Sequence, residues 1–284
     1  MFQWSNVCGA RPAVMGVINV TPDSFSDGGR YLDPQTAIAH GLELVDAGAD
    51  LLDVGGESTR PGAEPVDATE ELRRVVPVVA GLTAATDLPV SIDTTKAVVA
   101  AAAIDAGATI VNDVSAGRLD PAILEVTAAG RAGYIAMHML GEPRTMQDAP
   151  QYDDVVVEVG DFLVERLDAA RAAGVPDVAL AVDPGIGFGK TVEHNLALLA
   201  RLDELAERCA VPVVVGTSRK RFLGSILRDA AGEEGEPTAD QRDDGTLATV
   251  VWCLDHGAQI VRVHDVRPAA RAVQLLETME TATP

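Results

Sequence analysis

The sequence is poor in cysteine and has no long apolar run. Its three cysteines, Cys8, Cys209 and Cys253, lie far apart and outside metal-ligand spacing, which indicates reduced thiols in a cytoplasmic protein. No run approaches the roughly 20 apolar residues of a membrane-spanning helix, and the N-terminus has no charged-then-apolar signal pattern. We therefore expect a protein that does not associate with membranes.

Positive charge is also scarce. The formal net charge of −21 argues against nucleic acid as a partner, because such a partner requires an extended basic face. Only three lysines occur, Lys96, Lys190 and Lys220, against nineteen arginines. With 284 residues, 47% of them hydrophobic, the chain is long enough to bury one sizeable core.

The glycine-rich stretch 181–190 lacks both familiar phosphate-binding patterns. A P-loop needs glycine at the position of Pro184, and a dinucleotide fingerprint needs glycine at the position of Lys190. What the stretch does have is a buried apolar run ending in Asp183, followed by three glycines spaced two apart. This pattern predicts a site where a flat polar ligand closely approaches the backbone.

Apolar runs alternate with segments of helical spacing along the whole chain. The runs are near-continuous in Val, Ile and Leu, as in parallel strands covered on both faces. We expect strands at 14–20, 51–56, 89–93, 109–114, 134–139, 178–183, 211–217 and 259–265. We expect helices at 35–48, 68–85, from 96, 121–129, 154–173, 193–208, 219–228 and 268–281. Eight such units predict a single-domain α/β TIM barrel, with a doubly wound sheet as the alternative.

Two segments depart from the repeat. Residues 1–13 precede the first strand, and we expect them to form a cap over the bottom of the barrel. Residues 229–244 are acidic and polar, which predicts an exposed surface insertion before a second helix at 245–256.

A polar or charged residue ends every predicted strand. Since active sites of TIM barrels lie at the carboxyl ends of their strands, these side chains predict one binding site. Asn19, Arg60, Arg219 and His264 suit an anion, and Asn19 also offers an oxygen to a divalent cation. The other strand ends supply Asn112, Asp113, His138, Asp183, Lys220, Asp265, Asp93 and Arg262.

The remaining side chains suit a heterocycle. Asp93, Asn112 and Asp183 are acceptors for several ring N–H groups, Lys220 suits a ring carbonyl, and Arg262 suits stacking on a ring face. Asp113, Asp265 and His138 are expected to act as supports. The set predicts a planar aminated ring joined to a phosphate or diphosphate, and the loops 21–29 and 57–63 are expected to close over it.

The motifs together resemble those of dihydropteroate synthases, which are pterin-binding TIM barrels. They run in family order as Met15–Gly29, Asp53–Ala63, Ser91–Thr94, Asn112–Val114, Met137–Met139, Asp183–Lys190, Ser218–Gly224 and Ile260–Asp265. The resemblance implies a transferase of folate biosynthesis. It condenses 6-hydroxymethyl-7,8-dihydropterin diphosphate with p-aminobenzoate to 7,8-dihydropteroate and diphosphate by dissociative displacement.

The resemblance also implies roles for individual residues. Asp93, Asn112, Asp183 and Lys220 would hold the pterin beside Met137, Gly187 and Phe188. Arg262 would stack on the ring and, with Asn19, Arg60 and His264, receive the diphosphate and its Mg²⁺. The p-aminobenzoate side would comprise Phe25, Thr59, Pro61 and Ser218. Of these residues, Asp93, Lys220, Arg262 and Asn19 would carry the catalysis. A homodimer and sensitivity to sulfonamides are further implications.

Three alternatives remain. A paralogue that only binds pterins would have degraded loops, whereas both loops have the family's residues here. A pterin-dependent methyltransferase on the same barrel would not need residues 218–220 or 58–61. A scaffold protein without activity would not need a polar residue at every strand end.

Overall fold

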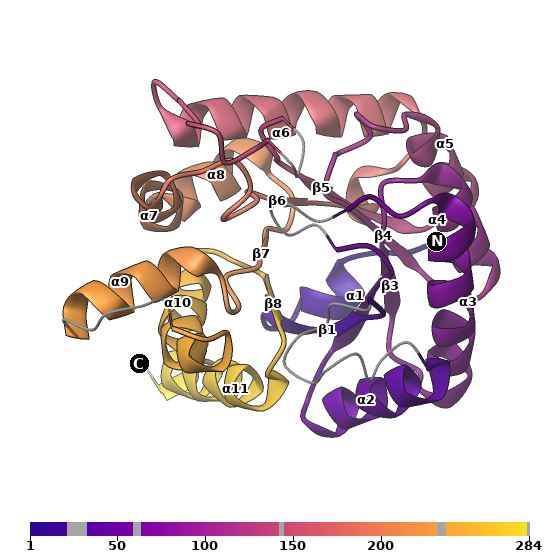
Figure 1. Cartoon of the computed structure of the whole chain (residues 1–284), viewed down its shortest axis with the longest axis horizontal. Helices are drawn as coiled ribbons and strands as arrows, with labels where there is room; N and C mark the ends of the chain where they lie inside the picture. Colours follow the sequence, from indigo (N-terminus) through magenta and orange to yellow (C-terminus); the bar gives the residue numbers. More distant parts are fainter. Residues whose placement is uncertain (22–32, 59–63, 142–144, 232–236, 283–284) are drawn as a thin grey trace.

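The protein is a barrel of eight parallel strands surrounded by helices (Figure 1). The computed structural model describes residues 1–21, 33–58, 64–141, 145–231 and 237–282. Strands pair in the order β6-β5-β4-β3-β2-β1-β8-β7, and a bridge between Val182 and Val213 connects the two ends. The strands are β1 Ala13–Asn19, β2 Leu51–Gly55, β3 Val90–Asp93, β4 Ile110–Asp113, β5 Gly133–Met137, β6 Leu180–Asp183, β7 Val214–Val215 and β8 Ile260–Val263. The TIM-barrel prediction is confirmed, and the doubly wound alternative is wrong.

The helices follow the strands as predicted, with local differences. They are α1 Ser5–Cys8, α2 Pro34–Asp46, α3 Ala68–Ala85, α4 Ala97–Asp105, α5 Ala122–Ala129, α6 Val155–Ala172, α7 Val192–Ala200, α8 Leu202–Cys209, α9 Arg221–Ala231, α10 Asp243–Asp255 and α11 Val266–Ala282. The single helix expected at 193–208 is wrong, because the chain leaves helical geometry at Arg201, whose φ is −123° and ψ 36°. The insertion is partly helical, since α9 extends to Ala231 and the 3₁₀ helix η3 covers Asp240–Arg242.

Side-chain caps define several helix starts. Asp33 accepts a hydrogen bond from the Thr36 amide, and Asp154 accepts from the Val156 and Val157 amides. Thr191 and His194 bond each other's backbone amides in a capping box at the start of α7. These bonds satisfy amides that a helix leaves unpaired in its first turn, so the strand-to-helix connections are fixed.

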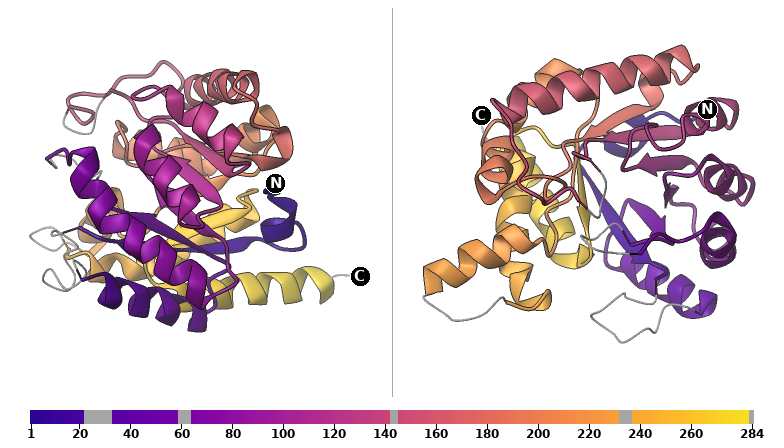
Figure 2. Two further views of the ribbon diagram at one scale, coloured as in Figure 1. Left: turned by 90° about the vertical axis from the view of Figure 1, so that its right-hand side faces the viewer. Right: turned by 45° about the horizontal axis from the view of Figure 1, so that its top comes forward.

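The barrel interior is apolar at the end where the strands begin. Met15, Leu51, Ile110 and Ile135 form this bottom layer with Ala13, Ala181, Val214 and Ile260. Trp4, only 1% exposed, packs against it and donates its indole N–H to the Ala179 carbonyl at 3.0 Å. The N-terminal segment therefore covers the bottom of the barrel, and Figure 2 shows it in indigo at one end of the strands.

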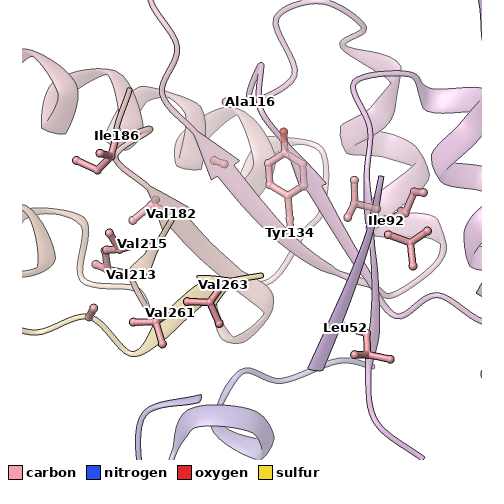
Figure 3. Packing of buried hydrophobic residues seen from close by; sticks show 14 of the residues in the cluster. Leu52, Ile92, Ala116, Tyr134, Val182, Ile186, Val213, Val215, Val261 and Val263 are labelled. Atoms are coloured by element: carbon pink, nitrogen blue, oxygen red, sulfur yellow. The ribbon is translucent and has the colours of Figure 1, made fainter. Parts of the chain in front are cut away.

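A second core fills the layer between strands and helices. Valines of β6, β7 and β8 pack together there, and Tyr134, Ile92 and Leu52 continue the layer (Figure 3). The β7 strand is shorter than the predicted run 211–217, because the Val213 amide donates to the Gln259 side chain at 2.7 Å rather than to a strand carbonyl. Within the described ranges, no helix has the length and hydrophobicity needed to cross a membrane.

Candidate active site

A cavity of about 1090 Å³ opens at the carboxyl ends of the strands. It brings together residues at or just after the ends of all eight strands, so residues far apart in the sequence face one space. The predicted site residues that line it are Asn19, Asp93, Asn112, Met137, Asp183, Gly187, Phe188, Ser218, Arg219, Lys220, Arg262 and His264. The predicted Phe25, Thr59, Arg60 and Pro61 lie outside the described residues.

One end of the cavity is an ion-pair network around Arg262. The guanidinium donates from Nε to Asp53 Oδ2 at 2.7 Å and from Nη2 to Asp93 Oδ2 at 2.9 Å. Asn112 Nδ2 donates to the same Asp53 oxygen at 3.1 Å. Burial raises the pKa of Asp93 to about 7, and Arg262 opposes this rise while Asp53 adds to it. Burial therefore opposes ionisation of Asp93, and the ion pair with Arg262 favours it.

Lys220 lines another part of the cavity, against Phe188. Its ammonium is 4.3 Å from the Phe188 ring centroid and donates to the Ile186 carbonyl. Burial lowers the pKa of Lys220 to about 8, and the carboxylate of Asp183 opposes this shift. A cation over an aromatic face beside a carboxylate suits a flat polar ring.

An apolar wall completes this part of the cavity. Val114, Met137, Met139 and Met146 are buried together, with Phe188 packed against them. Methionine side chains adapt to the shape of a ring, so this wall suits the face of a heterocycle whose edge meets the polar groups.

The glycines after β6 have a structural reason that sequence alone did not supply. Gly185, Gly187 and Gly189 have φ values of +67°, +83° and +67°, in the left-handed region that favours glycine. A Cβ on Gly185 would lie 1.8 Å from the carbonyl oxygen of His138. Gly185 is therefore needed for a close contact between two segments of the chain. Of the three glycines, Gly187 is the one that lines the cavity, so the predicted close approach of a ligand to the backbone applies to that residue.

Lys190 is buried under this glycine turn and holds it in place. Its ammonium donates to the carbonyls of Gly185 and Phe188, both at 3.0 Å, and lies 2.8 Å from His138 Nδ1. Burial, followed by the charge of Lys190, lowers the pKa of His138 to about 2, so the ring is a neutral acceptor. His138 is the support under the strand ends that its position predicted.

The predicted anion side contains two further pairs. Ser218 Oγ lies 2.9 Å from His264 Nδ1 and accepts the His264 amide at 3.2 Å. Arg219 donates from Nε and Nη2 to the two oxygens of Asp243 at 3.0 and 3.1 Å. The Asp243 pair was not predicted, and it orients the guanidinium with a carboxylate from α10.

A metal ion would have few protein ligands here. Among the described residues, no group of three His, Cys, Asp or Glu side chains is placed to hold an ion. Asn19 lines the cavity and supplies one neutral oxygen. Mg²⁺ commonly keeps several waters and binds through substrate phosphates, so this donor set fits an ion that arrives with a diphosphate.

Two sets of site residues were missed from the sequence. Asp53 is completely buried below the cavity; in the sequence it is a carboxylate inside the apolar run Leu51–Gly55 and the first residue of the motif Asp53–Ala63, and neither feature indicated its contacts. Lys96 donates to Glu57 and, at 2.6 Å, to the buried Glu71 of α3. These bonds fix the start of the loop after β2, whose residues 59–63 lie outside the described ranges. In the sequence Lys96 is only a lysine at the start of a predicted helix, and nothing there indicated its bonds to Glu57 and Glu71.

Comparison with known proteins identifies the family. The model of the pterin binding enzyme family matches residues 15–264. The dihydropteroate synthase of Mycobacterium leprae is 50% identical over 264 residues, which are 93% of this chain and 92% of that protein. The dihydropteroate synthase of Synechocystis is 44% identical over 98% of this chain and 92% of that protein.

Solved structures of dihydropteroate synthases have the same fold as this chain. Xanthomonas albilineans dihydropteroate synthase with 4-aminobenzoic acid superposes with a TM-score of 0.86 at 48% identity, covering 96% of this chain and 94% of that one. The Yersinia pestis enzyme in a sulfonamide drug complex gives a TM-score of 0.90 at 42% identity, covering 96% of both chains. The fold and the polar cavity thus define an enzyme of the pterin-binding class. Within that class, the chain belongs to the dihydropteroate synthases.

Proposed function

We propose that the cavity condenses 6-hydroxymethyl-7,8-dihydropterin diphosphate with p-aminobenzoate, giving 7,8-dihydropteroate and diphosphate. The observation that carries this proposal is the convergence of Asp93, Asn112, Asp183 and Lys220 on one cavity beside an apolar wall. Three acceptors and one cation complement the edge of an aminated ring that carries a carbonyl. The polar residues at the other side complement an anionic leaving group.

The pterin pocket acts by orientation. Asp183 is fixed because its Oδ1 accepts the Gly185 amide at 2.7 Å, which leaves Oδ2 for a ring N–H. Burial raises the pKa of Asp183, and the nearby charge of Lys220 opposes that rise. Phe188 and Met137 hold the ring faces, so the exocyclic methylene points toward the anion side of the cavity.

In the displacement step, the C–O bond between the methylene and the diphosphate breaks, and the electron pair leaves with the diphosphate. His264, Arg219 and Arg262 stabilise the charge that develops on the departing oxygen. The carboxylates of Asp93 and Asp183 stabilise the cation left on the pterin. The amine of p-aminobenzoate then forms the C–N bond, and its proton passes to solvent.

We assign Mg²⁺ to the diphosphate, with Asn19 as the protein ligand. When bound, the ion supplies neutralisation of the leaving group's charge. Ser218, Thr59, Pro61 and Phe25 are assigned to p-aminobenzoate. Of these four, Ser218 lies in the cavity wall, where His264 orients its hydroxyl.

The decisive experiment supplies the purified protein with both substrates and Mg²⁺ and measures dihydropteroate and released diphosphate. Asp183→Ala should abolish product, because a buried acceptor for the pterin is lost. Asp177→Ala is the matched control: this carboxylate is exposed and pairs with Arg171, so activity should be unchanged. Tight pterin binding without product would instead identify a pterin-binding paralogue. Methyl transfer from a folate to a cobalt centre would identify the methyltransferase.

Sulfonamides should inhibit this reaction in competition with p-aminobenzoate. The support is the resemblance of residues 21–29 and 57–63 to the family loops, and the drug complex of the Yersinia pestis relative. Growth of a folate-requiring host complemented with this chain should stop under drug. Growth that persists at drug levels that stop a sensitive control would contradict this assignment.

We also infer a homodimer in the cytoplasm. Helices α10 and α11 contact each other and expose Val251, Trp252, Leu275 and Met279, with 38% to 61% of each residue accessible. Exposed apolar side chains on two helices that contact each other support a protein interface. The thiols of Cys209 and Cys253 are buried and reduced, which suits the cytoplasm. Light scattering of the purified chain tests the dimer.

A further inference from the structure

Asp53 is a buried carboxylate to which the reaction above assigns no role. It lies in the middle of β2, is 0% exposed and is not among the residues that line the cavity. Taking a carboxylate out of water costs several kcal/mol, so its place in an otherwise apolar strand needs compensation. The compensation comes from two residues that do line the cavity.

One oxygen of Asp53 makes both contacts. Oδ2 accepts from Arg262 Nε at 2.7 Å and from Asn112 Nδ2 at 3.1 Å. Arg262 is on β8 and Asn112 on β4, and each of these strands is separated from β2 by one other strand. Asp53 therefore connects two opposite parts of the cavity floor from below.

The contact with Asn112 sets the orientation of the amide. Because Nδ2 is committed to a carboxylate, which only accepts hydrogen bonds, Oδ1 is the atom that Asn112 presents to a ligand. An oxygen in this place accepts a ring N–H, whereas an NH₂ group would repel it. The charge of Asp53 thus decides which edge of a heterocycle the amide recognises.

The contact with Arg262 provides a fixed point. The guanidinium has a second carboxylate partner, Asp93, through Nη2 at 2.9 Å. Asp93 lines the cavity and Asp53 does not, so only the Asp93 contact is open to exchange with a ligand. When a ring N–H of the ligand donates to Asp93, it replaces the hydrogen bond from Arg262 Nη2. The hydrogen bond from Arg262 Nε to Asp53 remains and keeps the guanidinium beside the ring.

We propose that Asp53 is the positioning residue of the pterin pocket. It holds the Asn112 amide with its oxygen toward the ligand, and it keeps its hydrogen bond with Arg262 Nε when the pterin replaces Arg262 Nη2 as the partner of Asp93. The proposal rests on the proposed function, because it takes the ligand of Asp93 and Asn112 to be the pterin. It assigns Asp53 no contact with substrate.

The test is pterin affinity in the full-length protein, measured by calorimetry with 6-hydroxymethylpterin, which has no leaving group. Asp53→Asn should weaken binding about tenfold or more, since it removes charge-assisted hydrogen bonds and lets the Asn112 amide invert. The KM for p-aminobenzoate at saturating pterin diphosphate should change by less than about twofold, because the effect is local. Ser91→Ala is the matched control.

Ser91 is a suitable control because it pairs with Asp53 in register, is equally buried and has no side-chain hydrogen bond among the described residues. Ser91→Ala should leave pterin affinity unchanged. A double variant with Arg262→Gln should lose less pterin affinity than the two single losses added together, because part of the effect of Asp53 passes through Arg262. Simple additivity of the two losses would overturn this route.

Other outcomes are also decisive. A folded Asp53→Asn protein with unchanged pterin affinity, or with equal losses for both substrates, would sink the proposal. If Asp53→Asn does not fold, Asp53→Glu keeps the charge but moves the oxygens by one methylene, and the same selective loss is expected. A wild-type protein that binds pterin but makes no dihydropteroate would contradict the proposed function alone.

Discussion

The two ends of the barrel interior have opposite chemistry on the same eight strands. At the bottom, Met15, Leu51, Ile110 and Ile135 pack against Trp4 in a buried apolar cluster. At the top, the same strands carry Asp53, Asp93, Asp183 and Arg262, with side chains facing the cavity or its floor. Residues only two or four positions apart on one strand thus belong to different environments.

The difference separates stability from activity. The bottom layer buries apolar surface, which is the main favourable contribution to folding. The top layer collects like-charged carboxylates and lysines with shifted pKa values, which cost stability and supply chemistry. Changes at the bottom should therefore alter unfolding, and changes at the top should alter turnover.

The largest expected effect is at the bottom. Trp4→Ala removes a side chain that is 1% exposed and should destabilise the protein by about 3–5 kcal/mol. Leu119→Ala is the control, since that leucine is 52% exposed and its loss should cost only about 1 kcal/mol. Denaturant unfolding measures both variants, and turnover of folded Trp4→Ala at low temperature should match wild type. Equal losses of stability in the two variants would contradict the role assigned to the bottom layer.

At the top, Lys220→Ala should lower kcat/KM for the pterin diphosphate about 10²–10³-fold, because the cation beside Asp183 is lost. Its unfolding midpoint should stay near wild type, since a partly buried ammonium contributes little net stability. Arg171→Ala, which breaks exposed ion pairs on α6, controls for loss of a positive charge and should leave kcat/KM unchanged. If Lys220→Ala lost much stability but kept normal turnover, the assignment of stability to the bottom layer and activity to the top layer would be contradicted.

Gly185 should affect both stability and activity, because the turn that it forms packs against the chain after β5 and also borders the site. Gly185→Ala places a Cβ 1.8 Å from the His138 carbonyl at φ +67°, which adds a clash of about 1–3 kcal/mol to left-handed strain of about 1–2 kcal/mol. Gly257→Ala has the strain at φ +94° but its nearest atom is 3.8 Å away. Unfolding measurements should find Gly185→Ala the more destabilised, and only that variant should lose pterin affinity. Similar results for both glycines would exclude the clash.

The smallest expected effect is on the pH profile. As pH rises through about 7, Asp93 ionises and becomes an acceptor, which should raise kcat/KM for the pterin diphosphate. As pH rises further through about 8, Lys220 loses its proton and kcat/KM should fall. Lys220→Arg should remove the alkaline decline, because a guanidinium stays protonated. An alkaline decline that persists in Lys220→Arg would assign it to another group.

Much of the fold was predictable because the apolar runs are local signals. Junctions such as Ala47-Gly48-Ala49 mark helix ends, and Gly48, Gly107, Gly174 and Gly257 all have the positive φ that a helix stop favours. The break at Arg201 and the short β7 were not predictable from periodicity. Both depend on how neighbouring segments pack rather than on the order of apolar residues.

The site was predictable as a set of strand ends but not as a network. Asp93, Asn112, Asp183 and Lys220 were expected to face one ligand, and the structure places them around one cavity. The pairing of Arg219 with Asp243 and of Lys96 with Glu57 was not foreseen. These contacts join residues whose proximity follows from the closed barrel and not from their spacing.

The sequence by itself determined the eight strand–helix units, the polar strand ends and the family, because each can be recognised from short stretches of consecutive residues. The tertiary structure decided which of two lysines near one glycine turn serves the ligand. Both lysines border the cavity, but the Lys190 ammonium is held by His138 and by the carbonyls of Gly185 and Phe188, whereas the Lys220 ammonium lies over the Phe188 ring. It also placed Asp53 beneath Arg262. Side-chain direction depends on strand register and on left-handed backbone at Gly185 and Gly189, and these are set only when the barrel closes.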